Sequence, residues 1–140
     1  MNNDTTILSD EELAKLVADG DSDKFGVLME RYQAKLFRYG KKFLSDSDNI
    51  EDVVQDVFIK TYQNIKSFDT TQRFSPWIYR IAHNTYINAI KKILVLYYIE
   101  DFSYKEIADI LHIPMGTVGV RIMRAKDILK EKYKELNIEM

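Results

Sequence analysis

The stretch SYKEIADILHIPMGTVGVRIMRA, residues 103–125, decides the fold of the second half of this chain. Ser103 and Glu106 have the spacing of a capping box, and the apolar residues after them recur at the three- and four-residue steps of a helix. A short turn around Pro114 follows, and a second amphipathic helix is expected from Thr117. Two short helices joined by a tight turn predict a helix-turn-helix, but a plain αα-hairpin fits the pattern equally well.

The first half of the chain also has the apolar periodicity of helices, and the alternation typical of strands is scarce. Apolar residues line one helical face across residues 22–43 and again across residues 50–65. Ser75 is expected to cap a further helix, with Pro76 in its first turn and no helix breaker before Asp101. We therefore predict an all-α fold of two small helical domains, the second a helix-turn-helix.

The composition excludes several classes of function. The 140 residues include no cysteine and two histidines, which excludes a disulfide scaffold, a cysteine-ligated zinc site and thiol catalysis and argues against any metal site. No Gly-rich phosphate loop, paired-carboxylate motif or Ser/His/Asp spacing stands out, so we do not expect an enzyme. No apolar run approaches the ~20 residues that span a bilayer, and the N-terminus lacks a signal pattern, so we expect a cytoplasmic protein without membrane insertion.

The net charge of −2 conceals an uneven distribution of charge along the chain. Residues 1–30 hold eight acidic and two basic residues, whereas residues 61–92 hold five basic residues and one acidic residue. Residues 119–134 hold six basic and two acidic residues. Because contact with phosphates depends on the local field, these two basic segments are compatible with nucleic-acid binding in a chain that is acidic overall.

Separated motifs in this chain resemble the extracytoplasmic-function (ECF) sigma factors of bacterial RNA polymerase. The run IEDVVQDVF at residues 50–58 and the run FSPWIYRIAHN at residues 74–84 are similar to region 2 of that family. The segments LYY at 96–98, FSYKEIA at 102–108 and IPMGTV at 113–118 are similar to region 4. Because the motifs occur in the family's order, the resemblance is much more specific than the helix-turn-helix pattern alone.

The resemblance implies a two-domain factor that directs RNA polymerase to promoters, needs no cofactor and catalyses nothing itself. Residues 1–92 would form the region 2-like domain, which docks on the core polymerase and reads and melts the −10 promoter element. Residues 93–140 would form the region 4-like helix-turn-helix domain, which reads the −35 element. The implied partners are the clamp helices and flap of the bacterial core polymerase, promoter DNA and, as for many such factors, an anti-sigma factor.

The residue types at the matching positions suit these implied roles. Asp52, Gln55 and Asp56 share one helix face and offer carboxylates and an amide to an arginine-rich polymerase surface. Aromatic rings, an amide and cations can hold unstacked bases and phosphates, which assigns −10 binding and melting to Lys66, Phe68, Arg73, Phe74, Trp77, Arg80, Asn84 and Lys91. The −35 contacts would come from Thr117, Val120, Arg121, Arg124 and Lys126.

Purely structural explanations compete with some of these assignments. An ordinary solvated helix face would account for Asp52, Gln55 and Asp56 if the family resemblance were set aside. Trp77 falls in step with the apolar residues of its expected helix, so core packing is the favoured interpretation of its ring. Asn84 and the loop residues before the helix are better candidates for DNA contact.

Two features depart from the pattern of the family. Gly119 and Val120 stand where the family usually has a basic and a small polar residue, so either the −35 sequence differs, or Val120 contacts a thymine methyl, or −35 binding is weak. The linker between the domains is apparently missing near 92/93, although the two promoter elements lie roughly 50 Å apart and about 15 extended residues are needed to cross that gap. Either residues are omitted at this junction, or residues 76–99 form one long helix and the chain can hardly reach both elements at once.

Other functions stay open on the sequence alone. A stand-alone helix-turn-helix transcription regulator that binds duplex DNA as a dimer would need only the second half of the chain. A sigma-like decoy that has lost its DNA contacts would account for Gly119 and Val120. The promoter sequence, the inducing signal and the identity of an anti-sigma partner do not follow from these residues.

Overall fold

The structure, a computed structural model, describes residues 7–135, with side chains described up to residue 131. Within that range the chain forms helices and no strand, which confirms the predicted all-α class. The helices are α1 (Asp10–Ala18), α2 (Phe25–Gly40), α3 (Ser47–Asn64), α4 (Phe74–Leu94), α5 (Tyr104–Leu111) and α6 (Met115–Glu135). Short 3-10 turns lie at Ser22–Lys24 and Ile65–Ser67, and a π-helical segment, Val95–Ile99, follows α4. The ends of the two expected domains, residues 1–6 and 136–140, lie outside the described residues.

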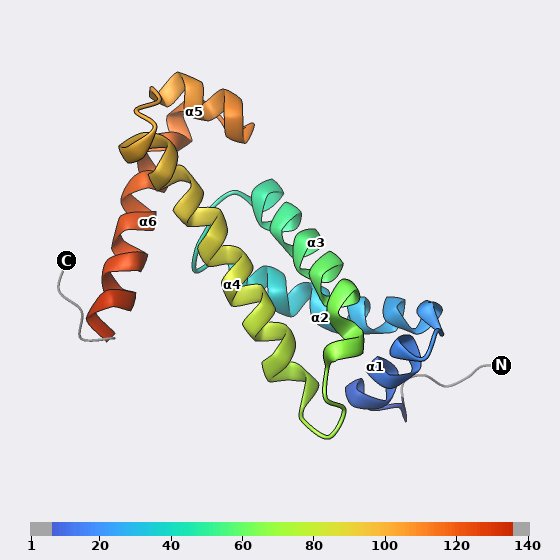
Figure 1. The fold of residues 1–140 in the computed structure, drawn as a ribbon. Helices are drawn as coiled ribbons and strands as arrows, with labels where there is room; N and C mark the ends of the chain where they lie inside the picture. The colour runs from blue at the N-terminus through green and yellow to red at the C-terminus, as the bar shows by residue number, and fades with distance from the viewer. Residues whose placement is uncertain (1–6, 136–140) are drawn as a thin grey trace.

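Helix α4 is the central element of the molecule. Figure 1 shows it as a long diagonal helix, with α1, α2 and α3 along its N-terminal part and α5 and α6 at its C-terminal end. Helix α3 packs along α4, and α6 also packs against α4. Among residues 7–135, no helix combines the length and the apolar composition that crossing a bilayer requires.

Local sequence signals set the start of two helices, and for α5 this confirms the predicted capping box. At α5, the Glu106 N–H donates to Ser103 Oγ at 3.1 Å and the Ser103 N–H donates to Glu106 Oε1 at 2.9 Å, so the capping box forms. These two hydrogen bonds hold the pKa of the Glu106 carboxyl below its usual range. The same reciprocal pair joins Ser9 and Glu12 at the start of α1. Both boxes satisfy backbone donors that have no partner within the helix.

The expected cap of α4 is wrong, because a carboxylate from another helix takes its place. Helix α4 begins at Phe74, one residue before the expected cap Ser75, and Arg73 precedes it without a side-chain capping bond. The Phe74 N–H instead donates to Glu11 Oε2 of α1 at 2.7 Å. A negative group at a helix N-terminus is favoured by the helix dipole and satisfies an unpaired donor. Helix α1 therefore fixes the position at which α4 begins.

A single hydrophobic cluster runs through both expected domains. It extends from Leu13 of α1 to Leu129 of α6. At the proposed junction, Ile90 and Ile93 of α4 are 3% and 1% exposed, and Ile122 of α6 is 4% exposed. No break in packing separates residues 7–92 from residues 93–131, so the two expected domains share one core.

The end of α2 passes close to a tyrosine of α4. Tyr86 is fully buried, its hydroxyl donates to the Leu36 carbonyl at 3.1 Å, and its ring stacks on Phe43 with centroids 5.1 Å apart. This burial raises the pKa of Tyr86 to about 12. A Cβ atom at Gly40 would overlap the Tyr86 hydroxyl and ring and lie 2.8 Å from Ile50 Cγ2. Gly40 is therefore required because α2 and the Tyr86 ring approach each other more closely than any side chain allows.

The predicted helix-turn-helix corresponds to α5, residues 112–114 and α6. His112 ends α5 with a left-handed backbone (φ 57°), and the Ile113 N–H donates to the Ala108 carbonyl at 3.0 Å. A left-handed residue after a helix is a common way to satisfy the last carbonyls and turn the chain. The turn brings Ile107 of α5 and Val118 of α6, both 0% exposed, into the core.

Candidate nucleic-acid and polymerase interfaces

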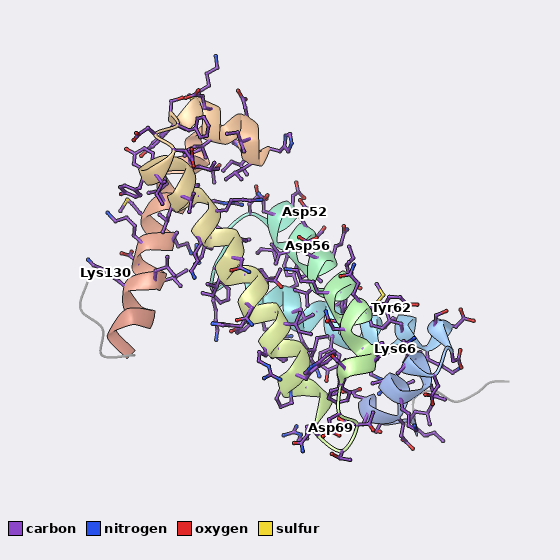
Figure 2. The ribbon with its side chains drawn as sticks, viewed as in Figure 1. Asp52, Asp56, Tyr62, Lys66, Asp69 and Lys130 are labelled. Carbon is purple, nitrogen blue, oxygen red and sulfur yellow. The ribbon has the colours of Figure 1, made fainter. Side chains whose placement is uncertain are left out.

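A cleft of about 660 Å³ opens where the loop after α3 meets the start of α4. Its lining combines aromatic, polar and cationic side chains: Ser67, Phe68, Asp69, Gln72, Arg73, Pro76, Trp77 and Arg80. Figure 2 shows Lys66 and Asp69 at this end of the molecule, far along α3 from Asp52 and Asp56. Four of the residues predicted for the −10 element thus lie together in one cleft: Phe68, Arg73, Trp77 and Arg80.

The aromatic residues of the cleft are mainly structural. Phe74 is 0% exposed and does not line the cleft, and Phe68 is 7% exposed. Their rings pack edge to face with centroids 5.4 Å apart, and Trp77 lies 4.9 Å from Phe68 and 5.7 Å from Phe74. The expectation that Phe74 contacts DNA is therefore wrong for this conformation, because its ring fills the core beneath α4. Trp77, half-buried in the cleft lining, is the ring best placed to meet a base.

The polar candidates of the same region are accessible. Lys66, Arg73, Arg80, Asn84 and Lys91 are all exposed. Trp77, Arg80 and Asn84 follow each other at steps of three and four, so they share one face of α4. Asn84 lies one turn beyond the cleft lining and not within it. The Asn84 amide can therefore contact a nucleotide at the rim of this cleft and not inside it.

Sequence reasoning missed several lining residues, chiefly Asp69 and Gln72. The Asp69 carboxylate accepts from the Thr71 N–H at 3.0 Å and from the Thr71 hydroxyl at 2.7 Å, which holds its pKa below the usual range. The Gln72 N–H donates to the Asp69 carbonyl at 2.9 Å. These bonds fold the loop into a compact turn beside Trp77. An Asp followed two residues later by a Thr is a turn signal in the sequence, and this signal could have indicated the turn that begins at Asp69.

The three residues predicted to dock on polymerase lie on one surface of α3. Asp52, Gln55 and Asp56 are all exposed, while Val53, Val54 and Val57 of the same helix are buried. Figure 2 shows Asp52 and Asp56 side by side on α3, at the end opposite Lys66. Both carboxylates also line a cavity of about 300 Å³ that includes Arg121 of α6. The sequence-predicted face therefore exists as a surface, and the helix-turn-helix lies next to it.

The residues predicted for −35 DNA have unequal exposure. Val120 is 56% exposed and Lys126 is exposed, whereas Thr117, Arg121 and Arg124 are half-buried. Arg124 Nη2 donates to the Lys41 carbonyl at 2.8 Å. Two of the five predicted contacts, the arginines, are thus turned toward the first half of the chain in this conformation.

Gly119 has a structural explanation that the sequence did not reveal. A Cβ atom there would lie 3.2 Å from Tyr104 Cε2 and 3.4 Å from the Tyr104 hydroxyl. The Tyr104 ring also contacts Tyr97, with centroids 5.5 Å apart. The absent side chain lets the aromatic ring of α5 cover α6, so Gly119 reflects packing within the helix-turn-helix.

Comparison with known proteins gives matches to both halves of the chain. Sigma-70 region 2 matches residues 28–93, and Sigma-70 region 4 matches residues 91–129. The chain is 28% identical to the ECF RNA polymerase sigma factor SigW of Bacillus subtilis, over 87% of this chain and 95% of that protein. This chain belongs to the ECF sigma factors. It is also 29% identical to the ECF RNA polymerase sigma-E factor of Haemophilus influenzae, over 92% of this chain and 97% of that protein.

Two solved structures have a similar fold, one of a region 2 and one that matches most of the chain. An engineered region 2 of sigmaE in complex with GTAAAA matches with a TM-score of 0.61 and 37% identity, over 66% of this chain and 96% of that one. CnrH in complex with the cytosolic domain of CnrY matches with a TM-score of 0.54 and 25% identity, over 90% of this chain and 97% of that one. Because both regions match, a stand-alone helix-turn-helix regulator is not favoured, and this sigma factor acts in promoter-specific transcription initiation.

The alignments also bear on the junction between the two regions. The alignment with SigW is 178 positions long, which exceeds the 140 residues of this chain. The relative therefore has residues with no counterpart here. The two family matches overlap at residues 91–93, so region 4 follows region 2 in this sigma factor without a linker between the matches.

Proposed function

We propose that this sigma factor directs core RNA polymerase to promoters by capturing the single-stranded −10 element in the cleft between the loop after α3 and the start of α4. The observation that carries the proposal is the cleft itself, where Trp77 lies with Arg73 and Arg80. A similar region 2 was solved with the oligonucleotide GTAAAA. The action proposed is binding and strand capture in the cytoplasm, with no reaction catalysed by the chain.

Each group in the cleft has a distinct physical part in the proposal. A base that leaves the duplex loses stacking, and the half-buried Trp77 ring offers a replacement surface worth about 1–3 kcal/mol. Arg73 and Arg80 are exposed cations in the same lining, Lys66 is exposed at the same end of the molecule, and all three hold the strand by its phosphates. Asn84 donates and accepts hydrogen bonds at the rim, where it distinguishes one base from another. Lys91 extends the cationic surface along α4.

The remaining assignments complete the proposal. Residues 1–92 act as the region 2-like domain, and residues 93–140 act as the region 4-like domain. Asp52, Gln55 and Asp56 dock on the polymerase through charge-assisted hydrogen bonds to its arginines. This surface and the cleft lie at opposite ends of α3, so the sigma factor contacts polymerase and the unpaired strand at the same time.

The strand-capture proposal predicts weaker binding of a fluorescent GTAAAA oligonucleotide when cleft cations are removed. The double variant Arg73→Ala, Arg80→Ala should lower affinity about 10-fold, because two phosphate contacts are lost. The slope of log affinity against log salt should flatten by about 1.4, since each contact with a single strand contributes about 0.7. Fluorescence anisotropy over a salt series measures both quantities.

Two further variants make this test specific. Asn84→Ala should retain the salt slope but reduce the preference for GTAAAA over a scrambled hexamer, and it should lower open-complex yield with core polymerase. Lys15→Ala removes an exposed cation of α1 outside the cleft and serves as the matched control. Equal affinity in the Arg73/Arg80 variant and the Lys15 variant would remove the cleft from the mechanism.

A further inference from the structure

Exposed apolar side chains lie on the outer side of α6, away from the core. Val120 is 56% exposed and Met123 is 67% exposed. Gly116 is exposed as well, and the three residues follow each other at steps of four and three, so they form one row along the helix. Val118 and Ile122, which are 0% and 4% exposed, lie on the opposite side of α6 in the core. We call residues 116, 120 and 123 the outer row of α6.

The cations of α6 lie beside the outer row and not in it. Arg124 donates to the Lys41 carbonyl, and Arg121 Nε and Nη2 are buried. Lys126 is exposed on the other flank of the helix, where its Nζ lies 5.5 Å from the centre of the Tyr98 ring. Since the row itself consists of glycine, valine and methionine, its side chains offer no N–H or O–H donor.

Packing within the helix-turn-helix keeps a longer side chain away from the position next to the row. A Cβ atom at Gly119 would lie 3.2 Å from Tyr104 Cε2, so a side chain there would require the ring to shift. The Tyr104 ring is 42% exposed and covers α6 at this point. Val120 therefore stands beside an aromatic ring of α5, and no cation lies between them.

The chemistry of the outer row matches one base in the major groove. A helix-turn-helix places the first turns of its second helix against base edges there. Arg or Lys recognises guanine and Asn or Gln recognises adenine by hydrogen bonds, whereas thymine also offers its 5-methyl group to apolar side chains. Valine has no hydrogen-bonding group and the methionine thioether is only a weak acceptor. Val120 and Met123 are therefore suited to thymine.

The charges around the outer row suit DNA and limit the length of the contact. Lys105 of α5 and Lys126 of α6 are exposed, and cations beside a recognition helix hold phosphates. Asp127 is also exposed and follows Met123 at a step of four, so a negative charge ends the row. Because phosphates repel a carboxylate, contact with base edges is confined to the turns that hold Val120 and Met123.

The spacing of the two apolar side chains fits neighbouring base pairs. Val120 and Met123 are separated by about 4.5 Å along the helix axis. Neighbouring bases of one strand are ~3.4 Å apart along the duplex. The two side chains can therefore contact adjacent bases, and the methionine is long enough to adjust to a difference of this size.

We propose, on the basis of the promoter-directing function proposed above, that Val120 and Met123 determine the −35 specificity of this sigma factor by contact with the methyl groups of two neighbouring thymines. The sequence indicated Val120 for this element but not Met123. Lys105 and Lys126 position the helix on the phosphates. At these two base pairs the upstream element is read by apolar contact and not by hydrogen bonds from arginine.

Removal of the thymine methyl groups tests this proposal. Core polymerase with the full chain first selects promoters from a duplex library randomised upstream of the start site, so that no sequence or spacing is assumed. The upstream element of the selected promoters should contain two neighbouring thymines. Deoxyuridine then replaces these thymines, which removes the methyl groups and retains base pairing. Holoenzyme affinity, measured by competition with the unmodified promoter, should fall about fourfold for each methyl group removed.

Variants of the outer row show whether these side chains meet the methyl groups. The double variant Val120→Ala, Met123→Ala should bind thymine and deoxyuridine promoters with affinities within about 1.5-fold of each other, because the apolar contact is gone. Both side chains are exposed and alanine favours a helix, so the fold should be retained. The control Met29→Ala removes a methionine of α2 that is 38% exposed and should retain the full effect of deoxyuridine.

The outcomes separate this proposal from the strand-capture function. Selection of no upstream element, selection of an element without thymine, or equal binding of thymine and deoxyuridine promoters by the original chain would each overturn the thymine proposal and leave strand capture standing. An unchanged deoxyuridine effect in the Val120/Met123 variant would also overturn it, because other side chains would then contact the methyl groups. Selection of no −10 motif would instead overturn the proposed function on which the inference rests.

Discussion

The triple variant Asp52→Ala, Gln55→Ala, Asp56→Ala is expected to lose at least about 30-fold in affinity for core RNA polymerase. The three side chains are exposed on one face of α3, and Val53, Val54 and Val57 behind them stay buried in the core. Truncation of a charge that is paired across an interface costs about 2–5 kcal/mol, largely because the partner charge is left unpaired. Even one such pair accounts for the expected loss.

The measurement is titration of core polymerase into labelled sigma factor at two salt concentrations. A matched variant, Asp19→Ala with Asp23→Ala, removes two exposed carboxylates that lie outside α3, at the end of α1 and just before α2, and should bind normally. Binding of GTAAAA should be unchanged in the triple variant, since the cleft lies at the other end of α3. Normal polymerase affinity in the triple variant would assign docking to another surface.

Replacing Gly40 with alanine is expected to lower the free energy of unfolding by about 3 kcal/mol and the melting temperature by about 10 °C. The new Cβ would overlap the Tyr86 ring and come within 2.8 Å of Ile50 Cγ2. Tyr86 is fully buried, so its ring has no open space into which it can move. Relief of the overlap would disturb its stack on Phe43 and its hydrogen bond to the Leu36 carbonyl.

Urea unfolding followed by circular dichroism measures this change, and the same helix supplies the control. Gly26 also lies in α2, but a Cβ atom there meets nothing within 4 Å. Gly26→Ala should therefore stabilise the chain by up to about 1 kcal/mol through helix propensity. If both alanine variants shift stability in the same direction by similar amounts, close packing at Gly40 is not the cause.

The class of fold and the place of most helices were predictable from the sequence. Apolar spacing and capping boxes act over a few residues, so the Ser103–Glu106 pair was enough to predict the start of α5. The family motifs are also short contiguous runs of residues, so they too could be recognised from the sequence alone. The start of α4 was missed because its cap, Glu11, lies 63 residues away in the chain. No local pattern contains that information.

The candidate site was predictable in residue type but only partly in position. The motif at residues 74–84 correctly indicated Arg80 and Asn84 as accessible polar groups. It could not distinguish Phe74, which fills the core, from Trp77, which lines the cleft, because both lie in one short aromatic-rich turn. Which ring faces water depends on the packing of α1 and the loop after α3 against α4.

The sequence by itself determined the all-α class and the order of the helices, because short-range periodicity carries that information. It left open the choice between a helix-turn-helix and a plain αα-hairpin and the nature of the junction near residue 92. Only the tertiary structure decided that α6 folds back on α4, that Arg121 and Arg124 face region 2, and that Gly40 and Gly119 make room for Tyr86 and Tyr104. These features arise where side chains distant in sequence compete for the same space, and the outcome of that competition depends on three-dimensional packing.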